Sequence, residues 1–161
     1  MEKFQELREQ AKKKLQLADH ILTMTYPLVK DSRLLIAAVE NLFLAFTNGM
    51  NSVLYYERLF KRIGPFPDNF TSKFDVFKDK CVKRYELDAE YLKIMRDIKD
   101  IIVAHKKSPM EFSRKENFVI CSDNYRMRSI SANELKVYVE KAKLFIKTVS
   151  TIVSKDEKIF R

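Results

Sequence analysis

A single histidine carries most of the chemistry that this sequence could perform. It lies in the segment KDIIVAHKK, residues 99–107, where His105 ends an apolar helical run and two lysines follow it. A histidine exchanges its proton near neutral pH, and lysines attract phosphate. Three interpretations stay open: a general acid or base in RNA cleavage, a phosphate contact without catalysis, or a helix-end histidine whose charged form interacts favourably with the helix dipole.

Helical phase limits the partners that His105 can have. Successive residues of an α-helix are rotated by about 100°, so His105 shares the apolar face with Ile102. Arg96 lies about 180° away around the helix, and the two side chains cannot meet on one regular helix. Lys99 is about 120° away and could approach only if the helix end loosens, and Asp100 is in a similar position on the other side.

The densest basic segment of the chain follows the histidine. Residues 106–128 hold six cationic side chains against three carboxylates, which leaves a local charge of +3. Aromatic residues are interleaved with the cations, and rings of this kind can stack on unpaired bases while cations engage phosphates. The segment therefore predicts RNA binding, with an ordinary solvated hairpin as the alternative. The candidate RNA-binding residues are Lys106, Lys107, Arg114, Lys115, Arg126, Arg128 and Tyr125.

Helices and one hairpin are needed to position these residues. Apolar residues recur at steps of three and four, which is typical of helices with one buried face. Short runs of β character flank the turn-rich triplet SDN and predict a β-hairpin over about 116–130. Because short connections make successive helices antiparallel neighbours, we predict an all-α fold, an up-down bundle of four to five helices with this hairpin before the last one. The helices are expected over residues 3–25, 32–63, 72–85, 89–105 and 132–153.

Local signals fix some of the expected boundaries. Tyr26-Pro27 should end the first helix, because the residue before a proline is pushed out of the α region. Ser131 and Glu134 form a capping box that should open the last helix. The tail from residue 154 onward is expected to fray, and residues 1–161 show no domain boundary.

The helix predicted over 32–63 should be the centre of the fold. It is apolar nearly all round, which marks a buried helix. Polar residues such as Glu40 and Asn48 interrupt any apolar run long enough to span a membrane, so no membrane segment is expected. Gly49 would let another helix approach closely.

Composition narrows the classes of function. The chain has 31 Lys and Arg against 22 Asp and Glu, a net charge of +9, which favours anionic partners or simply a solvated surface. Cys81, Cys121, His20 and His105 are scattered singly, so we expect no metal site, reduced thiols and a cytoplasmic protein. Only two glycines are present and no Gly-rich phosphate motif, so we expect no cofactor. The N-terminus lacks the apolar region of a signal peptide.

The helix order and the late histidine resemble the HEPN superfamily, small helical bundles that include RNase toxins and partners of minimal nucleotidyltransferases. RNase members carry an arginine, a polar residue, and a histidine four to six positions after the arginine. KDIIVAH has this layout in Lys99, Asp100 and His105, with lysine in place of arginine, while Arg96 in RDIKDIIVAH lies further upstream. The resemblance covers roughly residues 3–153 and implies a symmetric homodimer that joins two histidines.

Two functions therefore compete. The first is a HEPN-like RNA-binding protein, in its sharper form a metal-independent ribonuclease with His105 as acid or base. Lys99 or Arg96 would hold the phosphate, and Arg126 and Arg128 would guide the RNA.

The alternative is a non-catalytic helical interaction module. It would dimerise or dock to a nucleotidyltransferase-like partner. The contact would come from the helix over 32–63 or from the segment YYERLF at 55–60.

Overall fold

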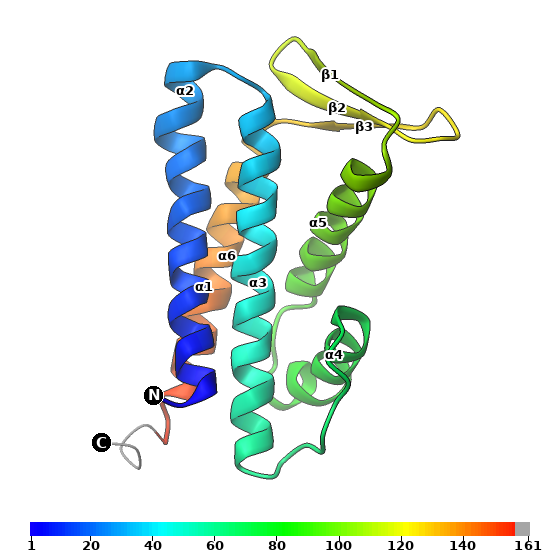
Figure 1. Ribbon diagram of the computed structural model, residues 1–161. Coiled ribbons are helices and arrows are strands. Elements are labelled where there is room, and N and C mark those ends of the chain that lie inside the picture. Colours follow the sequence, from blue (N-terminus) through cyan, green and yellow to red (C-terminus); the bar gives the residue numbers. More distant parts are fainter. Residues whose placement is uncertain (157–161) are drawn as a thin grey trace.

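Three long helices run side by side and bury their apolar stripes against one another (Figure 1). They are α1 (Lys3–His20), α3 (Arg33–Leu59) and α6 (Ala132–Val153) in the computed structural model, which describes residues 1–156. A fourth helix, α5 (Ala89–Lys107), packs on α3 and α6 at an incline to them. The predicted helical bundle is present.

Shorter elements close the two ends of this bundle. Below α5 lie α4 (Phe70–Val76) and a π-helical turn, Phe77–Val82. At the other end, away from the N-terminus, a small antiparallel sheet lies between α5 and α6 (Figure 1). Its strands are β1 (Met110–Arg114), β2 (Asn117–Cys121) and β3 (Met127–Ile130), in the order β1-β2-β3.

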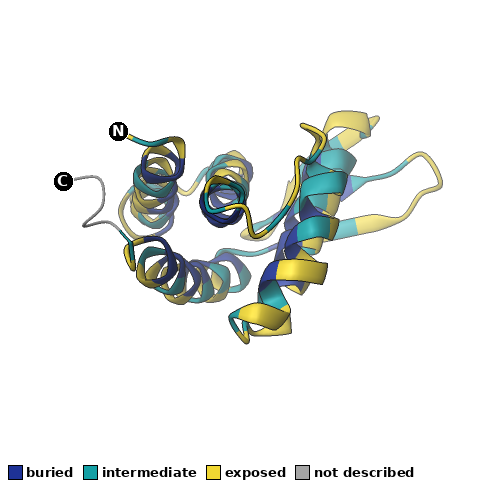
Figure 2. Cartoon of the chain, turned by 90° about the horizontal axis from the view of Figure 1, so that it is seen from below, coloured by how far each residue is buried: buried dark blue, intermediate teal, exposed yellow. Residues whose placement is uncertain are grey.

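The core forms where the apolar faces of the helices meet. Figure 2, a view from below, shows the buried sides of the helices turned toward one another. α3 is the central helix, with Leu42, Ala45 and Phe46 fully buried. By length and composition α3 could cross a membrane, and 56% of its most apolar window is buried inside this fold.

Gly49 permits the close approach between α3 and α6 that the sequence suggested. A Cβ atom at this position would lie 2.9 Å from Cε2 of Phe145 on α6. Phe145 is fully buried and packs on Phe46, with ring centroids 5.4 Å apart. The missing side chain of Gly49 therefore provides the space that the Phe145 ring fills.

The last helix and the hairpin follow the prediction, with one addition. α6 begins at its predicted cap, where the Ser131 hydroxyl accepts a hydrogen bond from the Glu134 amide at 3.2 Å. The hairpin predicted over 116–130 is present as β2 and β3. The strand β1, which pairs with β2 from Met110↔Cys121 to Arg114↔Asn117, was missed. Its sequence, MEFSR, is short and contains no β-branched residue, so its β propensity is low, and pairing with β2 stabilises it.

The prediction that Pro27 ends the first helix is wrong. α1 continues through a π-helical turn, Ile21–Thr25, into α2 (Tyr26–Val29). In the π-turn the Tyr26 amide bonds to the Ile21 carbonyl, and Pro27 then lies in the first turn of α2, where the missing N–H of a proline is tolerated. The helix ends instead at Lys30, which adopts a left-handed backbone.

Two other boundaries differ by a few residues. The helix predicted over 32–63 ends at Leu59, and Lys61 takes a left-handed φ of 58°. The helix predicted over 72–85 begins at Phe70, because the Asn69 side chain caps it by accepting a bond from the Ser72 amide at 2.9 Å. The fraying predicted for the tail falls largely on residues 157–161, which lie outside the described residues.

Candidate functional site

His105 is paired with a carboxylate that follows it closely in the chain. α5 delivers His105 in its last turn, and the chain then reverses through Ser108 and Pro109 into β1, which carries Glu111. His105 Nδ1 lies 2.9 Å from each carboxylate oxygen of Glu111. Both side chains are half-buried, with 35% of His105 and 21% of Glu111 exposed.

This contact assigns different roles to the two ring nitrogens of His105. An ionised carboxylate only accepts hydrogen bonds, so Nδ1 is the donor toward Glu111. In the neutral ring, Nε2 then carries the lone pair and can take up a proton. No other described residue has a hydrogen bond to Nε2. A carboxylate that orients a histidine in this way also stabilises the charged ring that proton uptake would produce.

The histidine lines a cavity of about 410 Å³ between α3, the end of α5 and the sheet. The wall is partly apolar, with Ile36 and Phe118 among its residues. On the α3 side it carries Arg33, the first residue of that helix. The cavity therefore combines a proton-exchanging nitrogen with a guanidinium, the side chain best suited to a phosphate.

Arg33 is held in place by a neighbour. Its Nη2 lies 2.7 Å from Oδ2 of Asp31, and its hydrogen bonds hold the pKa of the Asp31 carboxyl below its ordinary value. The Arg33 side chain is 81% exposed. A phosphate in the cavity would compete with Asp31 for this guanidinium. A hydrogen bond between the hydroxyls of Ser32 and Ser113 ties the start of α3 to β1 beside it.

The other predicted catalytic residues lie on different faces of α5. Arg96 is stacked over Phe74, with Cζ 5.0 Å from the ring centroid. Lys99 Nζ lies 5.4 Å from the centroid of Phe43 and 5.3 Å from that of Phe70. Neither side chain lines the His105 cavity. The helical phase had already placed Arg96 opposite the histidine.

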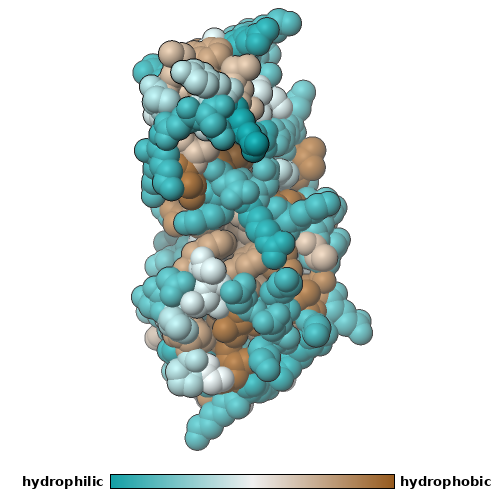
Figure 3. Space-filling view, turned by 90° about the vertical axis from the view of Figure 1, so that its right-hand side faces the viewer, coloured by the Kyte–Doolittle hydropathy of each residue, from teal (hydrophilic) through white to brown (hydrophobic). Residues whose placement is uncertain are grey.

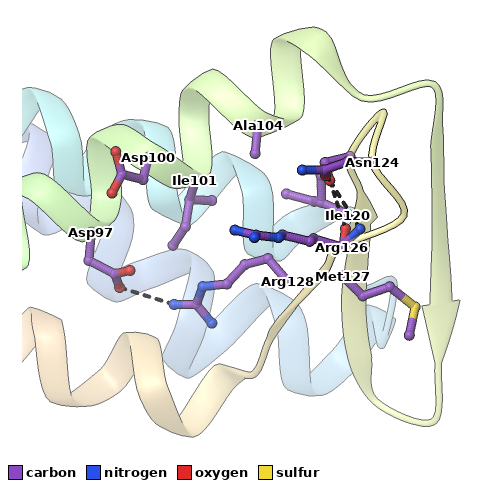
Figure 4. A pocket seen from close by; sticks show the side chains of 10 residues that line it. Asp97, Asp100, Ile101, Ala104, Ile120, Asn124, Arg126, Met127 and Arg128 are labelled. Carbon is purple, nitrogen blue, oxygen red and sulfur yellow. Dashed lines mark hydrogen bonds and ion pairs between the residues drawn. The ribbon is translucent and has the colours of Figure 1, made fainter.

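Asp100 lines another cavity, which lies between α5 and the β2–β3 hairpin (Figure 4). Two of the predicted RNA-binding residues, Arg126 and Arg128, line the same cavity. Arg126 belongs to the turn before β3, and Arg128 lies within that strand. The predicted catalytic and RNA-binding sets are therefore mixed in space.

Arg128 is occupied by acidic partners. Its Nη2 lies 3.0 Å from Asp97 on α5 and 2.5 Å from Glu134 on α6. The Tyr138 hydroxyl donates a further hydrogen bond to Asp97. Burial, followed by this bond, raises the pKa of Tyr138. Arg128 thus ties the sheet to both helices.

The remaining predicted RNA-binding residues are open to solvent. Tyr125 is 92% exposed and adopts a left-handed φ of 62°. Figure 3 shows the face that carries α5: hydrophilic side chains cover most of it, and apolar patches appear between them. Four of these exposed residues are cationic, and none of the four has an ion pair within residues 1–156. They are Lys106, Lys107, Arg114 and Lys115.

Sequence reasoning missed two residues of the His105 cavity. Glu111 is one of the three carboxylates counted in the basic segment 106–128, and Arg33 was not singled out. The chain reversal between α5 and β1 brings Glu111 to the histidine. The spacing of residues in the sequence does not predict the geometry of this reversal. The short separation of Glu111 from His105 was the one available signal.

Two of the six residues in the contact segment of the alternative function are internal. Within residues 55–60, Tyr56 and Glu57 are buried. The Glu57 carboxylate accepts hydrogen bonds from Arg84 and from the Tyr85 hydroxyl. These side chains are used within the fold.

Among residues 1–156, no group of three or more His, Cys, Asp or Glu side chains could hold a metal ion. Comparison of the chain with protein-family models, with curated proteins and with solved structures gave no significant match. The function of this chain is therefore inferred from the geometry of its side chains.

Proposed function

We propose that this protein binds RNA at the sheet end of the bundle and cleaves it without a metal, with His105 as the general base. The observation that carries the proposal is the contact of His105 Nδ1 with the Glu111 carboxylate at 2.9 Å, in a cavity that also holds Arg33. This arrangement leaves Nε2 to exchange a proton with a ligand. The Glu111 carboxylate compensates the charge that the ring gains.

The reaction follows from the chemistry of RNA. Nε2 of His105 removes the proton from a ribose 2′-hydroxyl, and the oxygen attacks the adjacent phosphorus. The bond to the 5′-oxygen breaks, this oxygen takes a proton from water, and a 2′,3′-cyclic phosphate remains. Arg33 would contact the phosphate oxygens, on which negative charge accumulates. General base catalysis of this kind contributes roughly 10²–10⁴-fold to a rate.

Exposed cations would hold the RNA across the same end. Lys106 and Lys107 directly follow the histidine, and Arg114 and Lys115 lie at the turn between β1 and β2. Cations that neutralise phosphates release counterions, so affinity should fall steeply as salt increases. Binding that resists salt would instead favour apolar recognition of a protein.

The decisive experiment measures cleavage and binding of one labelled, structured RNA in EDTA. We expect His105→Ala to lose roughly 10²–10⁴-fold in cleavage rate and to keep its affinity for the RNA. Glu111→Gln should lose part of the rate, because the neutral amide stabilises the charged ring less well. An RNA with 2′-O-methyl groups should bind and stay intact.

His20→Ala is the matched control, since His20 also lies in the last turn of a helix and is exposed there. It should cleave like the unsubstituted protein. Cleavage that persists in His105→Ala, or that is lost equally in His20→Ala, would contradict the proposal. Binding without any cleavage would leave an RNA-binding protein with a phosphate-contacting histidine.

The HEPN resemblance, the homodimer and the nucleotidyltransferase-like partner stay predictions. The cleavage chemistry above needs only the side chains of one chain. A dimer would add a second His105 to the site, and its effect would appear as a dependence of the specific activity on protein concentration.

A further inference from the structure

A larger cavity lies next to the His105 cavity, on the neighbouring face of α5. Its volume is about 540 Å³, and it opens between α5 and the β2–β3 hairpin (Figure 4). Ala104 lines it, and the next residue, His105, lines the first cavity. On the sheet, Ile120 belongs to this cavity and Phe118, two residues earlier in β2, to the other. A ligand that fills both would cross the end of α5.

The cavity has an apolar wall and a charged rim. Ile101, Ala104 and Ile120 supply apolar surface. Asp100 on α5 and Arg126 before β3 are exposed residues that line the same space. In Figure 4 the Arg126 side chain extends toward Ile101, while Asp100, the residue before Ile101 on α5, is drawn with its carboxylate turned away from Arg126.

Two pairs of opposite charges in this cavity behave differently. Asp97 and Arg128 are joined at 3.0 Å, and Glu134 also holds Arg128 (Figure 4 draws the first contact). The side chains of Asp100 and Arg126 have no hydrogen bond or ion pair to any residue within 1–156. The first pair fixes β3 against the helices, and the second keeps its full hydrogen-bonding capacity for a ligand.

We propose that this cavity binds a guanine base, presented by the bound RNA. Guanine offers two adjacent donors, N1–H and N2–H, which match the two acceptor oxygens of a carboxylate such as Asp100. It also offers two acceptors, O6 and N7, which match the donor fork of a guanidinium such as Arg126. Its ring would lie on the apolar wall beside Ile101. The inference rests on the proposed function for the source of the base, and the cavity chemistry would apply equally to a free guanine nucleotide.

The other bases fit this rim less well. Adenine places the acceptor N1 where guanine has a donor, so one carboxylate oxygen would face a lone pair. Cytosine offers a single amino group, and uracil a single N–H between two acceptors. Unpaired bases of single-stranded RNA expose these edges, which paired bases do not. The site would therefore select guanosine next to the phosphate at which His105 promotes cleavage.

The test uses the full-length protein and short fluorescent oligouridines with one central variable residue, with binding read from anisotropy. Guanosine should bind more tightly than adenosine, cytidine or uridine by about 5- to 150-fold, the range expected for one good bidentate contact. Inosine lacks the N2 amino group and 7-deazaguanosine lacks the N7 acceptor, so both should fall between guanosine and the other bases.

Two variants assign the contacts. Asp100→Asn should remove the difference between guanosine and inosine, and Arg126→Met the difference between guanosine and 7-deazaguanosine. Because both residues are exposed and unpaired, the folded state should be unaffected, which a thermal melt checks. Asp79→Asn and Lys78→Met make the same charge changes at exposed positions in the π-turn Phe77–Val82 and should keep every ratio.

The outcomes separate this inference from the proposed function. Equal, salt-dependent affinity for all probes would overturn the guanine site and leave RNA binding intact. Binding of guanosine monophosphate without affinity for any oligonucleotide would support the site and contradict the RNA function. A guanosine preference that survives both variants would overturn the assignment to this cavity. No binding of either ligand would overturn both proposals.

Discussion

Two glutamates show how differently the two ends of the molecule use a carboxylate. Glu57, near the end of α3, has a side chain that is 1% exposed and accepts bonds from Arg84, Tyr85 and Arg62, the last at 3.3 Å. Glu111, at the sheet end, is 21% exposed and holds only His105 among the described residues. A saturated, buried carboxylate stabilises the fold, whereas a half-open one keeps capacity for a ligand.

The difference shows which end of this molecule can hold a ligand. Polar groups at the Glu57 end bond to one another, so a ligand there would have to displace internal bonds. Polar groups at the sheet end, including Asp100 and Arg126, lie beside cavities and have donors or acceptors without a hydrogen-bond partner among the described residues. Substitutions should therefore affect stability at one end and binding or cleavage at the other.

The largest effect on stability is expected from Glu57→Ala. It leaves Arg84 and Tyr85 without their shared acceptor and opens a cavity, which should lower the free energy of unfolding by about 3 kcal/mol. Arg62 and Arg84 are partly exposed and can hydrogen-bond to water instead. The loss of stability should therefore lie at the low end of the range expected when one partner of a buried ion pair is removed. Urea denaturation measures it. Glu111→Ala is the counterpart and should change stability by less than about 1 kcal/mol; equal losses would remove the distinction.

An intermediate effect is expected from Arg128→Met. Its carboxylate partners Asp97 and Glu134 are about one-third exposed, so water replaces part of what is lost. We expect a decrease of about 1–2 kcal/mol in the free energy of unfolding, measured in the same way. A neutral result would mean that the sheet is attached to the helices by its apolar contacts alone.

A smaller effect is expected from Tyr85→Phe, and its size depends on pH. Burial, followed by the hydrogen bond to Glu57, raises the pKa of Tyr85 above its ordinary value of 10.0. The stabilisation that the protonated Tyr85 hydroxyl gives to the folded state is therefore complete below pH 10. It is lost as the pH rises from there toward the folded-state pKa. At neutral pH the substitution should cost about 1 kcal/mol.

Above pH 10 the measurement compares how steeply the free energy of unfolding changes with pH in the two proteins. Above pH 10 the free energy of unfolding of the unsubstituted protein should decrease with pH, and Tyr85→Phe should decrease less steeply. Identical slopes would show that folding does not raise the pKa of Tyr85. Denaturation at a series of pH values supplies both curves.

Much of the fold could be predicted because its signals are local. α6 shows an uninterrupted apolar repeat and a cap at Ser131, and both are contained in a short stretch of sequence. Gly49 was correctly identified as a point of close approach, although nothing in the sequence pointed to Phe145 as its neighbour. β1 was missed because it depends on pairing with β2. The continuation of the first helix past Pro27 was missed because it depends on a π-turn.

The candidate site was predicted in part for the same reason. His105 was identified from its position at a helix end. Glu111 and Arg33 reach it only through the reversal after α5 and the start of a distant helix. Lys99 and Arg96 were chosen by family layout, and their side chains lie over phenylalanine rings. Sequence spacing predicts neighbours along one helix well and neighbours across elements poorly.

The π-turn before α2 also sets the angular position of one anchor of the sheet. The Tyr26 hydroxyl, just beyond this turn, donates to the Glu116 carbonyl in the β1–β2 connection at 2.8 Å. A π-turn holds one residue more than the α-helical turn it replaces, and each residue rotates a helix by roughly 100°. Deleting an exposed residue of this turn, such as Met24, would turn Tyr26 away from the sheet and leave the buried Leu22 in the chain. The reach of β1 toward His105 therefore depends on the length of a helix on the far side of α3.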